Sequence, residues 1–178
     1  RLHLGASRLH KWLALIIGAQ LLIWFASGAL MSFWPIDEIH GDHLVDRKTI
    51  ETLPAGTALA DPAIYLRGIG TERVTLRMLH GRAVAEVIRG GGVVLYDAAT
   101  GTPLPAVDAS LAAAIAQKAW IGAKVAAPTT SRVTAASPEY RGPLPAWRVA
   151  FPDPDHTSVF VAADTGQIAA VRTANWRL

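Results

Sequence analysis

Imidazole and carboxylate side chains gather in residues 35–50, and this combination could hold a metal ion. The candidate ligands of this stretch are His40, His43, Asp37, Asp42 and Asp46. Neutral imidazole and carboxylate oxygens both bind divalent metals. Gly41 argues against a rigid helical presentation of the two histidines. A hydrated connector is therefore the alternative interpretation of this stretch, and pH sensing by the histidines is a further one.

The other reactive side chains give little support for a self-contained enzyme. The chain has no cysteine, which excludes disulfides, thiolate metal sites and thiol nucleophiles. His80 and His156 each fall between expected strands, where polar turn residues belong. The glycine run 90–92 also lies between two expected strands and lacks the lysine and helix that follow a phosphate loop, so we expect a hairpin turn there.

The candidate side chains near the N-terminus are positioned by an apolar stretch at residues 12–34. It runs from Trp12 to Trp34 without a charged residue. A helix of this length rises about 34 Å, enough to cross a hydrocarbon core of roughly 30 Å. The stretch predicts a transmembrane helix, and an uncleaved signal anchor would give the same topology.

The charges on the two sides of this stretch predict its orientation. Arg1, Arg8 and Lys11 precede it, and all 14 acidic residues follow it. The positive-inside rule then places the N-terminus in the cytoplasm and the rest of the chain in the periplasm, with lipid as one partner. The net charge of +3 belongs to the N-terminal flank. This distribution gives no support to nucleic-acid binding, which requires a basic patch on the folded part.

One face of the expected membrane helix is less apolar than the others. If the helix extends back through residues 1–11, a seven-residue recurrence brings five side chains near one face. These are His3, His10, Ile17, Trp24 and Met31. Gln20 and Ser27 lie beside them, and polar groups in hydrocarbon need a partner. We therefore predict that Gln20, Trp24 and Ser27 pack against another membrane helix or subunit.

From residue 51 onward the chain predicts an α+β region built from a duplication. Two Gly-containing turns, 96–101 and 161–166, each close a run of β-forming residues. Each unit has three expected strands. In the first unit they begin at Arg73 and cover 83–88 and 93–96, and in the second they begin at Arg132 and cover 146–151 and 158–161. The prolines that flank 146–151 suggest an edge strand.

A helix is expected before each set of strands. Asp61 precedes a proline at the first helical position and would open a helix over 63–68. Asp108 would cap an alanine-rich helix over 109–120. Each unit is thus predicted to be a helix packed on an antiparallel sheet of three or four strands, and two such units together are more stable than one.

These residues resemble the PepSY domain and its associated transmembrane helix. The resemblance lies in the turns "YDAATGTPL" and "VAADTGQI", and in a basic residue, His and Trp that lead into a span closing with Ser-Gly. The expected division is 1–11 cytoplasmic flank, 12–34 transmembrane helix, 35–50 acidic connector, 51–106 first PepSY-like unit, 107–173 second PepSY-like unit, and 174–178 return toward the membrane. The resemblance implies a further membrane helix after this return.

The resemblance implies a function in membrane electron transfer. Some PepSY transmembrane proteins resemble iron-siderophore reductases, which carry b-type haem between membrane helices. By this resemblance His10 is a haem axial ligand whose partner comes from a helix outside this chain, and His3 is a weaker candidate. The alternatives are a periplasmic protein-binding module that inhibits or chaperones peptidases, and an accessory subunit of a larger membrane complex.

Overall fold

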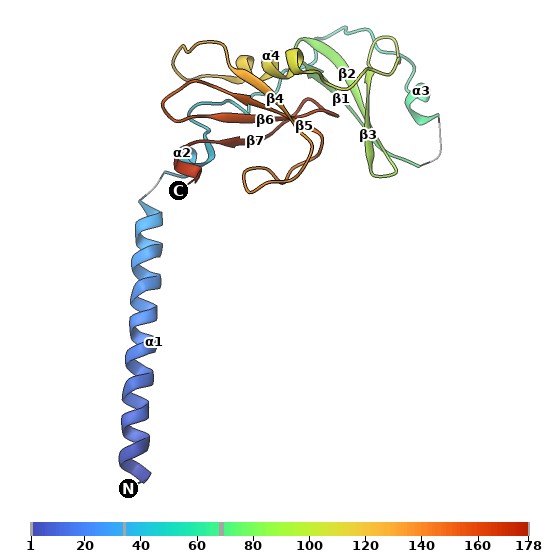
Figure 1. Cartoon of the computed structure of the whole chain (residues 1–178). Coiled ribbons are helices and arrows are strands. Elements are labelled where there is room, and N and C mark those ends of the chain that lie inside the picture. Colours follow the sequence, from blue (N-terminus) through green and yellow to red (C-terminus); the bar gives the residue numbers. More distant parts are fainter. Residues whose placement is uncertain (1, 34, 68–69, 178) are drawn as a thin grey trace. The chain divides into compact units, whose positions relative to one another are not determined.

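The computed structural model describes residues 2–33, 35–67 and 70–177 of the chain. The chain divides into two compact units, Arg1–Glu38 and Ile39–Leu178, and each is described separately. Figure 1 shows the long N-terminal helix of the first unit and the two sheets of the second. The α+β class with an N-terminal apolar helix and two antiparallel sheets is confirmed.

The first unit contains one long helix, α1 (Leu2–Ser32), and a short helix, α2 (Ile36–His40), follows it in the chain. Within α1, the segment Ser7–Leu30 has a mean hydropathy of 2.0 and is long enough to cross a membrane. A membrane anchor and a signal sequence both fit these properties. Large apolar side chains along the segment are exposed, Trp12 and Phe25 among them.

The first sheet of the second unit has three antiparallel strands, β1 (Thr71–Leu79), β2 (Arg82–Arg89) and β3 (Gly92–Asp97), in that order. His80 and Gly81 form the two-residue turn between β1 and β2, and both have positive φ. Gly90 and Gly91, also with positive φ, form the turn between β2 and β3. Both hairpin turns expected from the sequence are confirmed, because two-residue hairpins favour residues that tolerate positive φ.

The second sheet has four antiparallel strands, β4 (Thr129–Val133), β5 (Ala146–Ala150), β6 (Ser158–Ala162) and β7 (Ile168–Arg172), in that order. The prediction that a strand begins at Arg132 is wrong. Arg132 is the fourth of the five residues of β4, and it pairs with Trp147, the second residue of β5. The chain therefore leaves the ladder one residue later.

The edge position suggested for residues 146–151 is also wrong. β5 pairs with β4 on one side and with β6 on the other. Its flanking prolines lie outside the paired residues, so none of them removes a ladder hydrogen bond. They mark the two ends of a central strand.

Two short helices pack on the sheets. α3 (Ala63–Leu66) is a single turn whose buried Tyr65 contacts Ala85 and Val87 of the first sheet. The helix predicted over 63–68 is shorter and ends at Leu66, because the backbone of Arg67 is extended. Residues 68 and 69 lie outside the described part of the chain. α4 (Ala109–Ala119) begins at Asp108, whose carboxylate accepts a 2.8 Å hydrogen bond from the Leu111 N–H. This N-cap confirms the predicted start of the helix.

The main core of the second unit lies between α4 and one face of the four-stranded sheet (Figure 1). Its buried residues are Val45, Val107, Ala112, Ala116, Val149, Phe151, Val159, Val161 and Val171. Trp120, at the end of α4, stacks on Phe151 with ring centroids 4.3 Å apart. On the other face of the sheet Tyr140 stacks on Phe160 at 4.7 Å. Both faces of the sheet therefore carry buried residues.

Leu44 and Val45, which the sequence predicts to lie in a connector, contribute to this core. Val45 is completely buried and forms a β-bridge with Trp120. The Asp46 N–H donates to the Ala119 carbonyl oxygen at 2.8 Å, and the Ile121 N–H donates to the Leu44 carbonyl oxygen at 2.9 Å. The segment is thus hydrogen-bonded to the end of α4 on both sides of Val45.

A polar network joins the two sheets. Buried Glu86 on β2 accepts hydrogen bonds from Arg77 Nε at 2.9 Å and from Gln167 Nε2 at 3.0 Å. Arg77 also donates to the Thr165 carbonyl oxygen. The Glu86 carboxylate is therefore bonded both by β1 and by the turn between β6 and β7, and these contacts connect the two sheets. The chain then ends in a 3-10 helix, η1 (Asn175–Arg177).

Candidate functional site

His10, the residue that the resemblance implies as a haem ligand, lies within the apolar segment Ser7–Leu30 of α1. Its side chain is exposed on the helix. His3 lies on the same helix seven residues earlier, about two turns or roughly 10 Å along the axis. The side chain of His3 is outside the described part of the structure. The helix can therefore present the His10 imidazole to a neighbouring group.

The residues predicted to pack against another helix also lie on α1. Gln20 and Trp24 are exposed along the helix, as packing against a separate helix requires. The Ser27 hydroxyl donates a 2.9 Å hydrogen bond to the Trp24 carbonyl oxygen within the helix. Since that bond satisfies the hydroxyl, Gln20 is the polar side chain in this group with the greater need for a partner in hydrocarbon.

The histidines of residues 35–50 lie in different local structures. His40 is the last residue of α2, and His43 lies in the turn that follows. The Asp42 carboxylate forms ion pairs with Arg47 and with Lys48, whose Nζ is 3.2 Å from Asp42 Oδ2. The hydrogen bond from Arg47 is the main reason why the pKa of Asp42 lies below its ordinary value.

The neighbouring Asp46 is also engaged by the protein. It accepts hydrogen bonds from the backbone N–H groups of Lys48 and Thr49, at 2.9 and 3.0 Å, and from the Thr49 hydroxyl. Within the described residues, no group of three or more His, Asp or Glu side chains gathers in a way that could hold a metal. The metal site at His40 and His43 stays a prediction.

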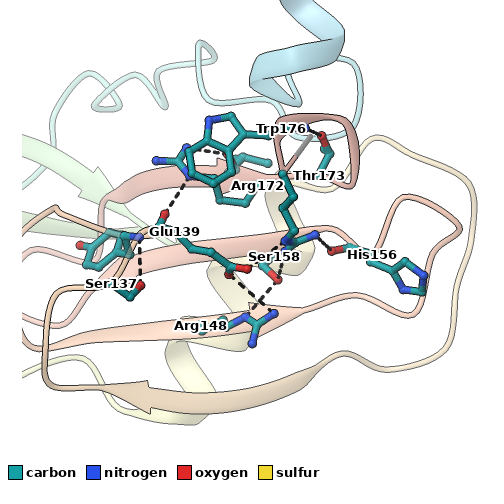
Figure 2. A network of polar contacts seen from close by, with 11 residues as sticks. Ser137, Glu139, Arg148, His156, Ser158, Arg172, Thr173 and Trp176 are labelled. Carbon is teal, nitrogen blue, oxygen red and sulfur yellow. Dashed lines mark hydrogen bonds and ion pairs between the residues drawn. The ribbon is translucent and has the colours of Figure 1, made fainter.

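A polar cluster of the second unit lies on β5, β6, β7 and η1 and on the loop before β5 (Figure 2). We call it the arginine cluster; it consists of Glu139, Arg148, Ser158, Arg172 and Arg177. Arg177 Nε donates to Glu139 Oε1 at 2.9 Å, and Arg148 lies 3.9 Å from Glu139 Oε2. Arg148 and Arg177 also share the Ser158 hydroxyl, at 3.1 and 3.3 Å. Two guanidinium groups thus converge on one carboxylate and one hydroxyl.

Arg172 is the third cation of the arginine cluster. Its Nε donates to the Glu139 carbonyl oxygen at 2.8 Å, and its guanidinium carbon lies 4.0 Å from the centre of the Trp176 ring. Burial is the main cause that lowers the pKa of Arg172, and the nearby charges of Arg47 and Arg177 act in the same direction. The group remains charged, because arginine loses its proton only at very high pH.

A separate groove of about 440 Å³ lies where β1, α4 and the turn before β7 meet. Met78, Leu79 and Ile115 give it apolar walls. Glu51 and Lys118 form an ion pair at its rim, and the hydrogen bond from Lys118 is the main cause of the lowered pKa of Glu51. The charges at this rim are thus already paired with each other.

Comparison of the chain with protein-family models, with curated proteins and with solved structures finds no match. Functional arguments therefore rest on the residues and their geometry. Sequence reasoning singled out the histidines but missed the arginine cluster. Its members come from a loop, from three different strands and from η1, and no spacing along the chain connects them.

Proposed function

We propose that this chain is a membrane-anchored component of a haem-linked electron-transfer or iron-siderophore reduction system. In this proposal α1 crosses the inner membrane with its N-terminus in the cytoplasm, and the second unit is a periplasmic pair of PepSY-like units. The observation that carries the proposal is the position of His10, three residues inside the apolar segment Ser7–Leu30. An ionisable residue within a membrane span is a functional candidate by default.

The chemistry of His10 fits haem ligation. An imidazole nitrogen is a common axial ligand of haem iron. At a rise of about 1.5 Å per residue, His10 lies only about 5 Å along the axis from the start of the apolar segment, so its haem would lie near the cytoplasmic face. The second ligand would come from another membrane helix, and a helix that places Gln20 and Trp24 against a partner would bring such a ligand close.

The second unit supports the PepSY part of the proposal in a general way. Each sheet is antiparallel, the sheets have three and four strands, and β3 and β6 each lead into a turn that contains a positive-φ glycine, Gly101 or Gly166. The helices differ, since α3 has one turn and α4 has three. The two halves are thus similar in their strands and turns and different in the helix that covers them.

The test is a visible absorption spectrum of the full chain, purified in mild detergent from cells supplied with haem, before and after dithionite. We expect a reduced b-type α band that is lost or shifted in His10→Ala. The matched control is His80→Asn, which removes a histidine from a turn while keeping a residue that tolerates the positive φ found there. This control should leave the band unchanged.

Two results would contradict the proposal. A band that persists unchanged in His10→Ala would keep the haem and exclude His10 as its ligand. A folded and membrane-inserted chain without any haem band would exclude the haem function as a whole. His3→Ala, measured in parallel, separates the two histidines of α1, because only the true ligand should move the band.

A second candidate function is a protein-binding module, favoured by the free edge of β1. β1 pairs with β2 on one side, and on its other side no strand is paired with it within the described residues. Leu76 on this strand is 43% exposed, and the groove of about 440 Å³ adjoins its end. An extended peptide segment of a peptidase could add to this edge. Hydrogen exchange should then slow at the amides of residues 74–78 when such a peptidase is added, and protection elsewhere alone would contradict this mode.

A further inference from the structure

Among the residues that the structure describes, the arginine cluster brings three guanidinium groups together with one carboxylate. Arg148 and Arg177 both pair with the carboxylate of Glu139. Figure 2 shows Arg148 and Arg172 near this residue. Arg172 reaches this residue only through its carbonyl oxygen. Guanidinium groups that gather on one residue repel one another. A bound anion would relieve this repulsion.

The geometry of the cluster suits a phosphate group. Guanidinium groups offer paired N–H donors that match phosphate oxygens. The Arg148 side chain is 40% exposed and that of Arg177 is 25% exposed, so both remain open to a ligand from solvent. Trp176, whose ring lies against Arg172, adds an amphipathic side chain of the kind enriched at membrane interfaces. The cluster thus combines cations with an interfacial aromatic ring.

The cluster also lies where the chain enters the second unit. A Cβ added at Gly41 would come within 2.6 Å of Val171 and 3.3 Å of Thr173, the neighbours of Arg172. Seven residues separate Ser32, the end of α1, from His40, and part of this stretch is the short helix α2. Such a stretch spans about 20 Å at most. The chain thus enters the second unit beside the strand that carries Arg172.

We propose that the arginine cluster binds the phosphate of an anionic phospholipid headgroup at the surface of the membrane that holds α1. This inference rests on the membrane anchoring in the proposed function and is independent of haem. The lipid phosphate offsets the positive charge of the three arginines, and Trp176 lies in the headgroup layer. Lipid binding would then restrict the orientation of the second unit on the bilayer.

The experiment uses the full chain in nanodiscs, and the absence of cysteine makes site-specific labelling simple. A fluorophore on Asn175→Cys, an exposed position in η1, reports on the cluster, and one on Ala99→Cys reports on the turn after β3. The discs contain phosphatidylcholine with a headgroup-nitroxide lipid as quencher, with or without phosphatidylglycerol. We expect at least twofold more quenching at Asn175→Cys in the anionic discs and no change at Ala99→Cys.

Charge variants test whether the cluster causes this effect. Arg148→Gln and Arg172→Gln should each weaken the apparent association with anionic discs about fivefold, as expected for one cation at a lipid surface. Lys124→Gln removes a positive charge outside the cluster and should have no effect. Arg172→Lys keeps the charge and should retain most of the quenching. Salt near 1 M reduces the Debye length to about 3 Å and should abolish the difference between the discs.

Each outcome decides the proposal. Equal quenching in neutral and anionic discs would overturn it, and so would unchanged quenching in the glutamine variants, whose folding is checked by thermal unfolding. Release of the label by free glycerol phosphate would assign the cluster to a soluble phosphate compound and overturn the lipid assignment. A chain that does not enter nanodiscs at all would instead refute the membrane anchor of the proposed function.

Discussion

Val45 provides a direct test of whether residues 41–50 belong to the folded unit. The Val45→Ala variant removes two methyl groups from a side chain that is completely buried and that bridges Trp120. A freely hydrated connector would tolerate this change. A packed segment would not, because the surrounding core closes only partly around the space that is left.

The size of the effect follows from the burial. Each buried methylene contributes about 0.8 kcal/mol, so two contribute about 1.6 kcal/mol. The remaining cavity, at about 24 cal/mol per Å³ of unfilled volume, adds roughly 1 kcal/mol. We therefore expect Val45→Ala to lower the free energy of unfolding by about 2–3 kcal/mol. For a folded unit of this size the melting temperature should fall by about 5–10 °C.

The assay is guanidinium-induced unfolding of the full chain in detergent, followed by the near-UV circular dichroism of its tryptophans. Ile50→Ala is the matched control, since Ile50 lies five residues further along the same segment and is 83% exposed. It should change the free energy of unfolding by no more than about 0.5 kcal/mol. Val45→Thr, which keeps the volume but buries a hydroxyl, should cost about 1–3 kcal/mol. Equal stability of Val45→Ala and Ile50→Ala would refute the packing of this segment.

Two further predictions concern the carboxylates of the second unit. Asp108→Ala should cost about 1 kcal/mol of stability in thermal unfolding, because it removes the cap bonded to the Leu111 N–H. Asp108→Asn keeps a capping oxygen and should retain most of this stability. An equal loss in both variants would contradict the capping role. Asp97 has its pKa lowered mainly by the hydrogen bond from the Thr100 N–H, with a further contribution from Arg82. A lowered pKa means that the ionised Asp97 carboxylate stabilises the folded protein above the unfolded pKa of about 4, and that this stabilisation is lost as the pH falls through the folded pKa. In denaturant titrations Asp97→Asn should therefore lose less stability than the wild type between about pH 4 and pH 2. Parallel stability curves for the two proteins would exclude this role.

Features that depend on neighbouring residues were predictable from the sequence. The apolar run of α1 needs only the composition of one continuous segment. The turns at His80 and Gly90 follow from residues that tolerate positive φ between two runs of β-forming residues. The start of α4 follows from a single aspartate in the correct position. In each case the stabilising contacts are made within a few residues of the chain.

Features that depend on distant partners were missed or were predicted wrongly. The flanking prolines of β5 suggest an edge strand, yet its central place depends on β4 and β6, which come from either side of it in the chain. The beginning of β4 is set by its register with β5 and not by its own residues. Local patterns describe how a segment can fold, and the register is decided by the strand across from it.

The sequence by itself determined the apolar helix, the α+β class, most of the strands and turns, and the histidines that are candidates for chemistry. Only the tertiary structure decided that Val45 is a core residue and that Arg148, Arg172 and Arg177 meet around Glu139. The physical reason is that helices and turns are stabilised by contacts close in sequence. A core or a charge cluster forms where segments far apart in the chain are packed together, and no residue spacing records that meeting.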